Sequence, residues 1–174
     1  MEKLPDELTL LILSFLSPVD LWRSVRNING KYLKFAEEVA QREHIPKFRI
    51  GLNFTLSSGT HHRWYDVRGT VQTGFVHINR FNTQYALFEV IEVLPKSCPG
   101  RVQEKWKQIC ASGFGTAQEW RVTFRGDGIL MKLPNLVLSN GDGVWCDWRE
   151  MLDGYLDRSV EAWEGVAHQW RGLT

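Results

Sequence analysis

The hydrophobic pattern of this 174-residue chain changes its period at Pro46. Before Pro46, apolar residues recur at intervals of three and four, which is typical of amphipathic helices. Beyond it, apolar and polar residues alternate from Phe48 to Leu56, which is typical of a strand with one buried face. Such a chain cannot be all helix or all sheet. We therefore predict a helical module over 1–45 and an α+β domain over 46–174.

The helical module is predicted to contain three helices. The first begins at Leu4-Pro5-Asp6-Glu7, where proline suits the first turn and the two acids favour the positive end of the helix dipole. Ser17 is expected to cap the second helix, and the third is expected to run from about Asn29 to His44. The first helix is apolar on nearly all sides, at Leu8, Leu10, Leu11, Ile12, Leu13, Phe15 and Leu16. Either the rest of the chain or a separate partner must therefore cover it.

The domain after Pro46 is predicted to be a mainly antiparallel sheet of five to seven strands, with one crossing helix and a C-terminal helix. The expected strands are 48–56, 64–71, 75–78, 85–94, 120–124, 129–133 and 136–138. Helices are expected over 102–110 and from about Asp147, and the Asp127-Gly128 pair predicts a hairpin. The predicted core includes Phe48, Ile50, Leu52, Val90, Trp106, Val122 and Phe124. No internal repeat is present, which excludes a propeller or a leucine-rich solenoid.

The helical module resembles the F-box motif. The resemblance rests on four stretches whose residue types and intervals agree with the family pattern: Leu4-Pro5-Asp6-Glu7-Leu8, Ile12-Leu13-Ser14-Phe15-Leu16, Asp20-Leu21 and Val25. F-box modules are small helical units that bind the Skp-type adaptor of a cullin–RING ubiquitin ligase. The resemblance thus implies a Skp-type adaptor as partner and, through it, a cullin. It assigns the adaptor contact to Leu4, Pro5, Leu8, Ile12, Leu16 and Leu21.

The sequence carries no recognisable catalytic or metal-binding constellation. It lacks a Walker lysine, a Gly-x-Ser-x-Gly elbow and an His-Glu-x-x-His pair. Cys98, Cys110 and Cys146 are widely spaced and form neither a disulfide framework nor a metal clasp. The adjacent His61 and His62 would point to opposite faces of a strand. We expect no enzyme activity, no cofactor and no metal.

Charge and hydropathy exclude two further partner classes. The chain has 21 Lys and Arg against 20 Asp and Glu, so no broad positive field favours a nucleic acid or an acidic membrane. No apolar run is long enough to span a bilayer, and the acidic start does not resemble a secretory signal. We expect a cytoplasmic or nuclear protein, or one present in both compartments.

The aromatic residues of the second domain indicate a binding surface. The chain has eight Trp, most of which should lie in the core. Trp64, Tyr65 and Trp145 stand beside polar or turn residues and are expected to face a target. The leading interpretation is a substrate-recruiting subunit of an SCF-type ubiquitin ligase with an unidentified protein target. Two alternatives stay open: an adaptor-bound regulatory protein outside a ligase, and a sugar- or small-ligand-binding module.

Overall fold

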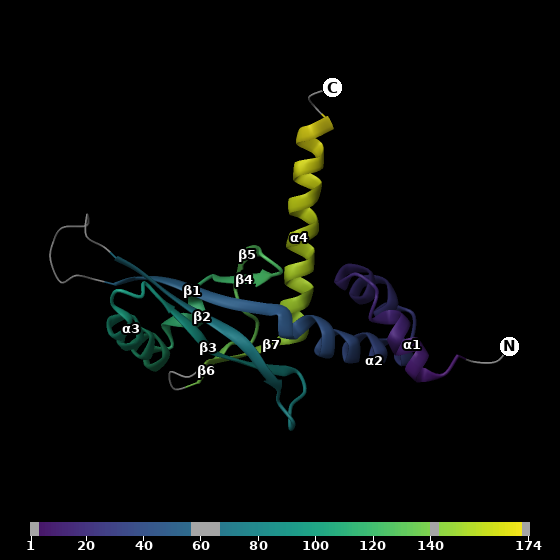
Figure 1. The fold of residues 1–174 in the computed structure, drawn as a ribbon, viewed down its shortest axis with the longest axis horizontal. Helices are drawn as coiled ribbons and strands as arrows, with labels where there is room; N and C mark the ends of the chain where they lie inside the picture. The colour runs from purple at the N-terminus through teal and green to yellow at the C-terminus, as the bar shows by residue number, and fades with distance from the viewer. Residues whose placement is uncertain (1–3, 57–66, 140–142, 172–174) are drawn as a thin grey trace. The chain divides into compact units, whose positions relative to one another are not determined.

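The computed structural model describes residues 4–56, 67–139 and 143–171 (Figure 1). The chain divides into two compact units, Met1–Lys47 and Phe48–Thr174. The sequence places the boundary after residue 45, and the structure places it after Lys47. The first strand begins immediately at Phe48, so the change of hydrophobic period coincides with the change of unit.

The first unit is helical, but its middle segment differs from the prediction. Its elements are α1 (Asp6–Leu13), the π-helical turn η1 (Asp20–Ser24), the 3-10 turn η2 (Val25–Asn27), α2 (Gly30–Val39), the π-helical turn η3 (Ala40–His44) and the 3-10 turn η4 (Ile45–Lys47). The predicted second helix is therefore present as a helical segment over 18–27, but most of it is π-helical and 3-10 rather than α-helical. Near its end, the side-chain Nδ2 of Asn27 donates to the Arg23 carbonyl at 2.7 Å. The predicted cap at Ser17 is confirmed, because the Asp20 N–H donates to Ser17 Oγ at 3.1 Å.

The first unit has an apolar core of its own. The buried set is Leu13, Leu21, Trp22, Val25, Phe35, Ala36, Val39, Ala40 and Ile45. Ile28 follows Leu21 and Val25 at helical intervals of four and three residues, yet it is 60% exposed. It follows a 3-10 turn, whose tighter winding rotates the next side chains relative to an α-helix. Tyr32 is only half-buried.

The second unit is an α+β fold built on one antiparallel sheet. The strands are β1 (Phe48–Leu56), β2 (Val67–Ile78), β3 (Tyr85–Leu94), β4 (Trp120–Phe124), β5 (Asp127–Met131), β6 (Val137–Ser139) and β7 (Gly143–Asp147). The seven strands are ordered β5-β4-β1-β2-β3-β7-β6. The helices are α3 (Pro99–Ser112), followed by the 3-10 turn η6 (Phe114–Ala117), and the long α4 (Trp148–Arg171), which is yellow in Figure 1.

Both helices of the second unit cover the same face of the sheet. The ring of Phe48 on β1 lies 5.1 Å from that of Tyr155 on α4. The indole of Trp120 on β4 lies 6.1 Å from that of Trp106 on α3. Phe48 pairs with Phe124, so even-numbered residues of β1 and β4 share one face. The unit is therefore two-layered, with its opposite face lined by polar residues of β1.

Three details of the sheet correct the sequence prediction. The two strands expected over 64–71 and 75–78 are one strand, β2, as far as the described residues go, since 64–66 lie outside them. This strand is irregular between Gln72 and Thr73 and between Phe75 and His77. The hairpin turn between β4 and β5 consists of Arg125 and Gly126, both with positive φ, rather than the Asp127-Gly128 pair. Strand β7 is additional.

The remaining predictions for this unit hold closely. β1 and β3 have the expected bounds, and α3 ends at Ser112 with Gly113 as its C-cap, where a φ of 67° suits glycine. Asp147 caps α4, because its Oδ1 accepts from the N–H groups of Arg149 and Glu150 at 3.0 and 3.1 Å. Of the seven predicted core residues, Val90 and Phe124 are half-buried and the others are buried.

Candidate functional site

Helix α1 presents an unusual amount of apolar surface. Leu8, Leu11 and Ile12 share one helical face, and each is about half exposed. Leu4 precedes the helix and is 49% exposed, while Phe15 follows it and is 82% exposed. Leu13 turns to the opposite side and is buried. We call the five exposed side chains the α1 stripe: Leu4, Leu8, Leu11, Ile12 and Phe15.

The local sequence explains why the stripe is presented on a short, well-defined helix. The Thr9 N–H donates to the Pro5 carbonyl at 3.0 Å, and the Thr9 hydroxyl contacts the same oxygen at 3.2 Å. The last turn tightens, because the N–H of Phe15 donates to the Ile12 carbonyl at 3.2 Å, three residues back. Pro5 and Thr9 thus fix the start of the helix, and the tight turn fixes its end.

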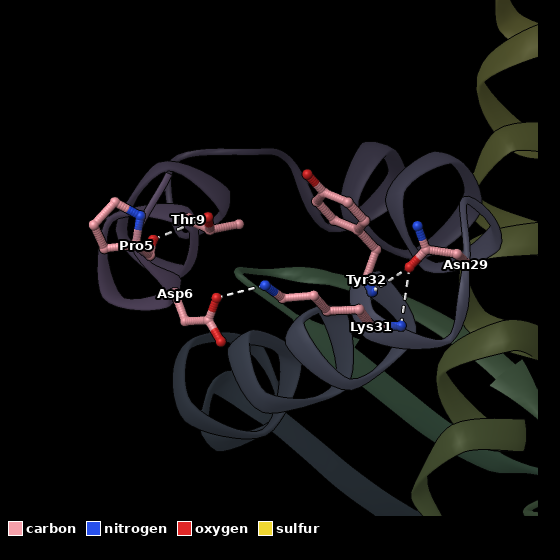
Figure 2. A network of polar contacts seen from close by, with 6 residues as sticks. All are labelled: Pro5, Asp6, Thr9, Asn29, Lys31 and Tyr32. Carbon is pink, nitrogen blue, oxygen red and sulfur yellow. Dashed lines mark hydrogen bonds and ion pairs between the residues drawn. The ribbon is translucent and has the colours of Figure 1, made fainter. Parts of the chain in front are cut away.

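A groove of about 500 Å³ lies between α1 and α2. It is lined by Leu4, Thr9, Ile12, Leu13, Lys31, Tyr32 and Phe35. Figure 2 shows Lys31 reaching from α2 to Asp6 on α1, where Nζ and Oδ1 are 2.5 Å apart. Asn29 caps α2, with its Oδ1 accepting from the N–H groups of Lys31 and Tyr32 at 2.9 and 3.1 Å. The groove joins the α1 stripe through Leu4 and Ile12.

The six predicted adaptor-contact residues do not share one environment. Leu4, Pro5, Leu8 and Ile12 are exposed and lie on or beside the α1 stripe. Leu16 is half-buried, and Leu21 is completely buried. Leu21 can support the surface from within the core, but a partner cannot touch it without rearrangement.

Leu11 and Phe15 belong to the same exposed surface as the predicted contact residues. They were missing from the predicted adaptor contact, although both stand in the apolar run of the first helix. The signal that identifies them is the spacing of Leu8, Leu11, Ile12 and Phe15, which places all four on one helical face. The exposed surface is therefore broader than the motif positions alone.

Only one of the three predicted target-facing residues lies in the described part of the chain. Trp64 and Tyr65 lie outside the described residues, as do His61 and His62. Trp145 is half-buried on β7, with its ring 5.5 Å from that of His77 on β2 in an edge-to-face arrangement. Trp145 thus stands in the sheet itself rather than in a turn.

A second concave region, which the sequence did not indicate, lies beside α3 and β1. A hollow of about 810 Å³ is lined by Leu52, Asn53, Phe54, Thr55, Lys105, Gln108, Ile109, Ser112, Gly113 and Gln118. A smaller one of about 230 Å³ is lined by Leu56, Arg101, Glu104, Lys105 and Gln108. Because Lys105 and Gln108 line both hollows, we treat them together as the α3–β1 groove.

The potential metal ligands of the described residues are not gathered into one cluster. No group of three or more potential metal ligands occurs among residues 4–56, 67–139 and 143–171. Burial, with a smaller contribution from Asp147, raises the pKa of the Cys146 thiol far above its usual range. Cys146 is therefore a poor nucleophile. None of the described helices has the length and apolar character needed to cross a membrane.

Comparisons with known proteins found no match, so a function is proposed below from the local geometry. No protein-family model matches the chain. No curated protein and no solved structure matches it either.

Proposed function

We propose that this chain is the substrate-recruiting subunit of an SCF-type ubiquitin ligase, as its resemblance to F-box proteins implies. In this proposal the first unit binds a Skp-type adaptor through the α1 stripe and the adjoining groove. The second unit binds a protein target. The chain makes no bonds itself; it acts by raising the effective concentration of the target near the ubiquitin-charged enzyme.

The α1 stripe is the observation that carries the proposal. Five large apolar side chains are gathered on a helix of eight residues and its two flanks. Contiguous apolar patches of this kind mark interaction surfaces, since leaving them in water is unfavourable. Burying each leucine or isoleucine fully contributes about 1.5–3 kcal/mol.

The shape and the lining of the groove between α1 and α2 also support the proposal. Its apolar wall includes Ile12 and Phe35, while Lys31 and Thr9 place polar groups at its margin. An apolar centre with a polar margin is the usual composition of a protein interface. The contact of Lys31, which lines this groove, with Asp6 joins α2 to α1, as Figure 2 shows. A partner helix or loop can therefore meet a defined surface rather than a pair of separate helices.

The test is capture of a purified Skp-type adaptor by the full-length protein and by a Leu8→Ala, Ile12→Ala variant. Truncating a large apolar side chain at the centre of an interface costs about 2 kcal/mol or more. The double variant should therefore bind about 10³-fold more weakly, because each 1.4 kcal/mol is about tenfold. Circular dichroism establishes that the variant is folded.

Leu33→Ala is the matched control. Leu33 is also an exposed apolar residue of the first unit, but it lies on the side of α2 away from Lys31 and Phe35. Its truncation should leave adaptor capture unchanged. Equal capture by wild type and a folded Leu8→Ala, Ile12→Ala variant contradicts the proposed contact. Capture of the adaptor without a cullin, in a mixture that contains both, contradicts the ligase role and favours a regulatory protein bound to the adaptor.

A further inference from the structure

The second half of β1 has an open edge. β2 pairs with β1 along its length, as far as Leu56. On the other side, β4 pairs with β1 only from Phe48 to Gly51. Within the described residues, the segment 52–56 therefore has one strand neighbour instead of two. An open edge of this kind offers backbone donors and acceptors to another strand.

The backbone groups that face this edge can be identified. The Ile50 carbonyl is directed toward β2, where it accepts from the Thr73 hydroxyl at 3.0 Å. The N–H and C=O groups of successive strand residues point to alternate sides. Hence the N–H and C=O groups of Asn53 and Thr55 point away from β2, toward the open edge.

The α3–β1 groove runs along the same edge. Its lining includes Leu52 and Phe54 from the helix-covered face of β1 and also Asn53 and Thr55 from the opposite face. A hollow lined by residues of both faces must open at the edge of the strand, because successive side chains point to opposite faces. Glycine at position 69 leaves room for the Phe54 ring, since a Cβ there would lie 2.7 Å from Phe54 Cε2.

The facing wall of the groove is a polar line along α3. The line consists of Arg101, Lys105, Gln108 and Ser112, at intervals of four, three and four residues. Lys105 is half-buried and lines both hollows. In the described part of the chain, no carboxylate lies within ion-pair distance of its ammonium group. Glu104 is the one acid in the lining, so the wall carries more positive than negative charge.

We propose that the α3–β1 groove binds an extended acidic peptide of a partner protein, which adds as a strand to the open edge of β1. The peptide backbone pairs with Asn53 and Thr55, and a peptide carboxylate meets Lys105. Five strand residues span about 16 Å, which sets the length of the bound segment. This inference goes beyond the proposed function and rests on the second unit alone, so it does not require the adaptor contact.

The charge of the wall argues against a second copy of the chain as the occupant. Edge-to-edge pairing of two β1 strands would bring the Lys105 ammonium groups of both copies to the same interface, and like charges oppose this. A small acidic ligand could bind Lys105, but it would leave the backbone N–H and C=O groups of Asn53 and Thr55 without a strand to pair with. An acidic peptide satisfies both features of the groove.

The experiment selects binding peptides from a displayed library of random decapeptides on the full-length protein. Enriched peptides should be acidic and rich in β-branched residues, which favour strands. A labelled synthetic copy of the most enriched peptide then serves as the probe in a fluorescence anisotropy titration. Its binding should slow hydrogen exchange at the amides of Asn53 and Thr55. Failure to enrich any peptide, or binding without that protection, overturns the proposal.

Two matched pairs of variants locate the contact. Thr55→Pro removes the N–H at the open edge and should weaken peptide binding at least tenfold, whereas Thr55→Val keeps the N–H and should bind like wild type. Lys105→Glu should weaken binding at least tenfold, whereas Lys107→Glu, on another side of the same helix, should not. The Lys105 pair and the amide exchange decide the question even if Thr55→Pro does not fold.

The remaining outcomes are equally distinct. Wild-type affinity in a folded Thr55→Pro variant overturns the proposal. So does a dimer of the chain that Thr55→Pro abolishes, because it identifies a second copy as the occupant. Adaptor capture, measured in parallel, should be unchanged in all four variants. Loss of peptide binding with intact adaptor capture thus separates this inference from the proposed function.

Discussion

The ammonium group of Lys31 lies 2.5 Å from the carboxylate of Asp6 and joins the first turn of α2 to the first turn of α1. Both side chains are more than half exposed, at 54% and 57%. Lys31 also lies over the ring of Phe35, 5.2 Å from its centre. One cation therefore holds the acidic start of α1 and covers an aromatic ring of the groove.

This ion pair should position the helices more than it stabilises them. Exposed ion pairs contribute about 0–1 kcal/mol, since water and salt screen them. Asp6→Asn should lower the melting temperature of the chain by no more than about 3 °C, with a smaller effect at high salt. Differential scanning calorimetry at two salt concentrations measures this. Glu43→Gln, which removes the exposed Arg42–Glu43 pair, is the control; a loss near 10 °C in Asp6→Asn alone would contradict the assignment.

The α1 stripe should make the isolated protein self-associate. Phe15 is the most exposed large apolar residue of the first unit, and Leu11 lies on the same helical side. A Leu11→Ser, Phe15→Ser variant should shift the protein toward monomer, because it removes part of a contiguous apolar patch. Light scattering after size exclusion gives the mass. Ile28→Ser removes an exposed apolar residue elsewhere and should have a smaller effect; a monodisperse wild-type monomer at high concentration would rule out this prediction.

Gly143 should be intolerant of any side chain. A Cβ at this position would clash with the Phe88 carbonyl oxygen, which belongs to the backbone and cannot rotate away. Gly143→Ala should therefore lower the free energy of unfolding by about 2 kcal/mol or more. Gly100→Ala is the control, since no atom lies within 4 Å of a Cβ there. It should stabilise the chain by about 0.5 kcal/mol in a urea titration, and equal effects of the two changes would disprove the close approach.

The three cysteines should react in a defined order. Cys98 and Cys110 are half-buried, whereas Cys146 is buried and the pKa of its thiol is strongly raised. A raised pKa reduces the thiolate population at a given pH, so Cys146 should resist iodoacetamide at pH 8 while the other two are alkylated. Peptide mass spectrometry locates the label. All three should react in denaturant; rapid labelling of Cys146 in the native protein would contradict its burial.

The sequence predicted correctly those elements that are specified by residues close together in the chain. The alternation in β1, the apolar spacing in α3 and the cap at Ser17 are all set by residues close together in the chain. Strand β7 lacks such a signal. Four of its five residues are buried, so it shows no polar alternation, and its strand character depends on pairing with β3 and β6.

The same distinction applies to the candidate sites. The apolar residues on nearly all sides of the first helix predicted that some apolar surface would need a partner. Only the structure shows that Leu13 and Leu21 are buried while Leu8 and Phe15 are exposed. The α3–β1 groove could not be predicted, because it depends on where the β1–β4 pairing stops. Gly51 is the last residue of that pairing, yet the apolar alternation of β1 continues past it to Leu56.

The strand order also determines when each part of the sheet can form during translation. β1, β2 and β3 are consecutive in the chain and adjacent in the sheet, so this meander can form as soon as residue 94 has emerged. The β1 edge of this meander stays unpaired until Phe124 of β4 can pair with Phe48. The β3 edge stays unpaired until Asp147 of β7 can pair with Tyr85. At about 5–20 residues per second, translation leaves both flanks of the nascent sheet exposed for several seconds. During this interval the growing chain needs protection from other nascent chains more than the finished protein does.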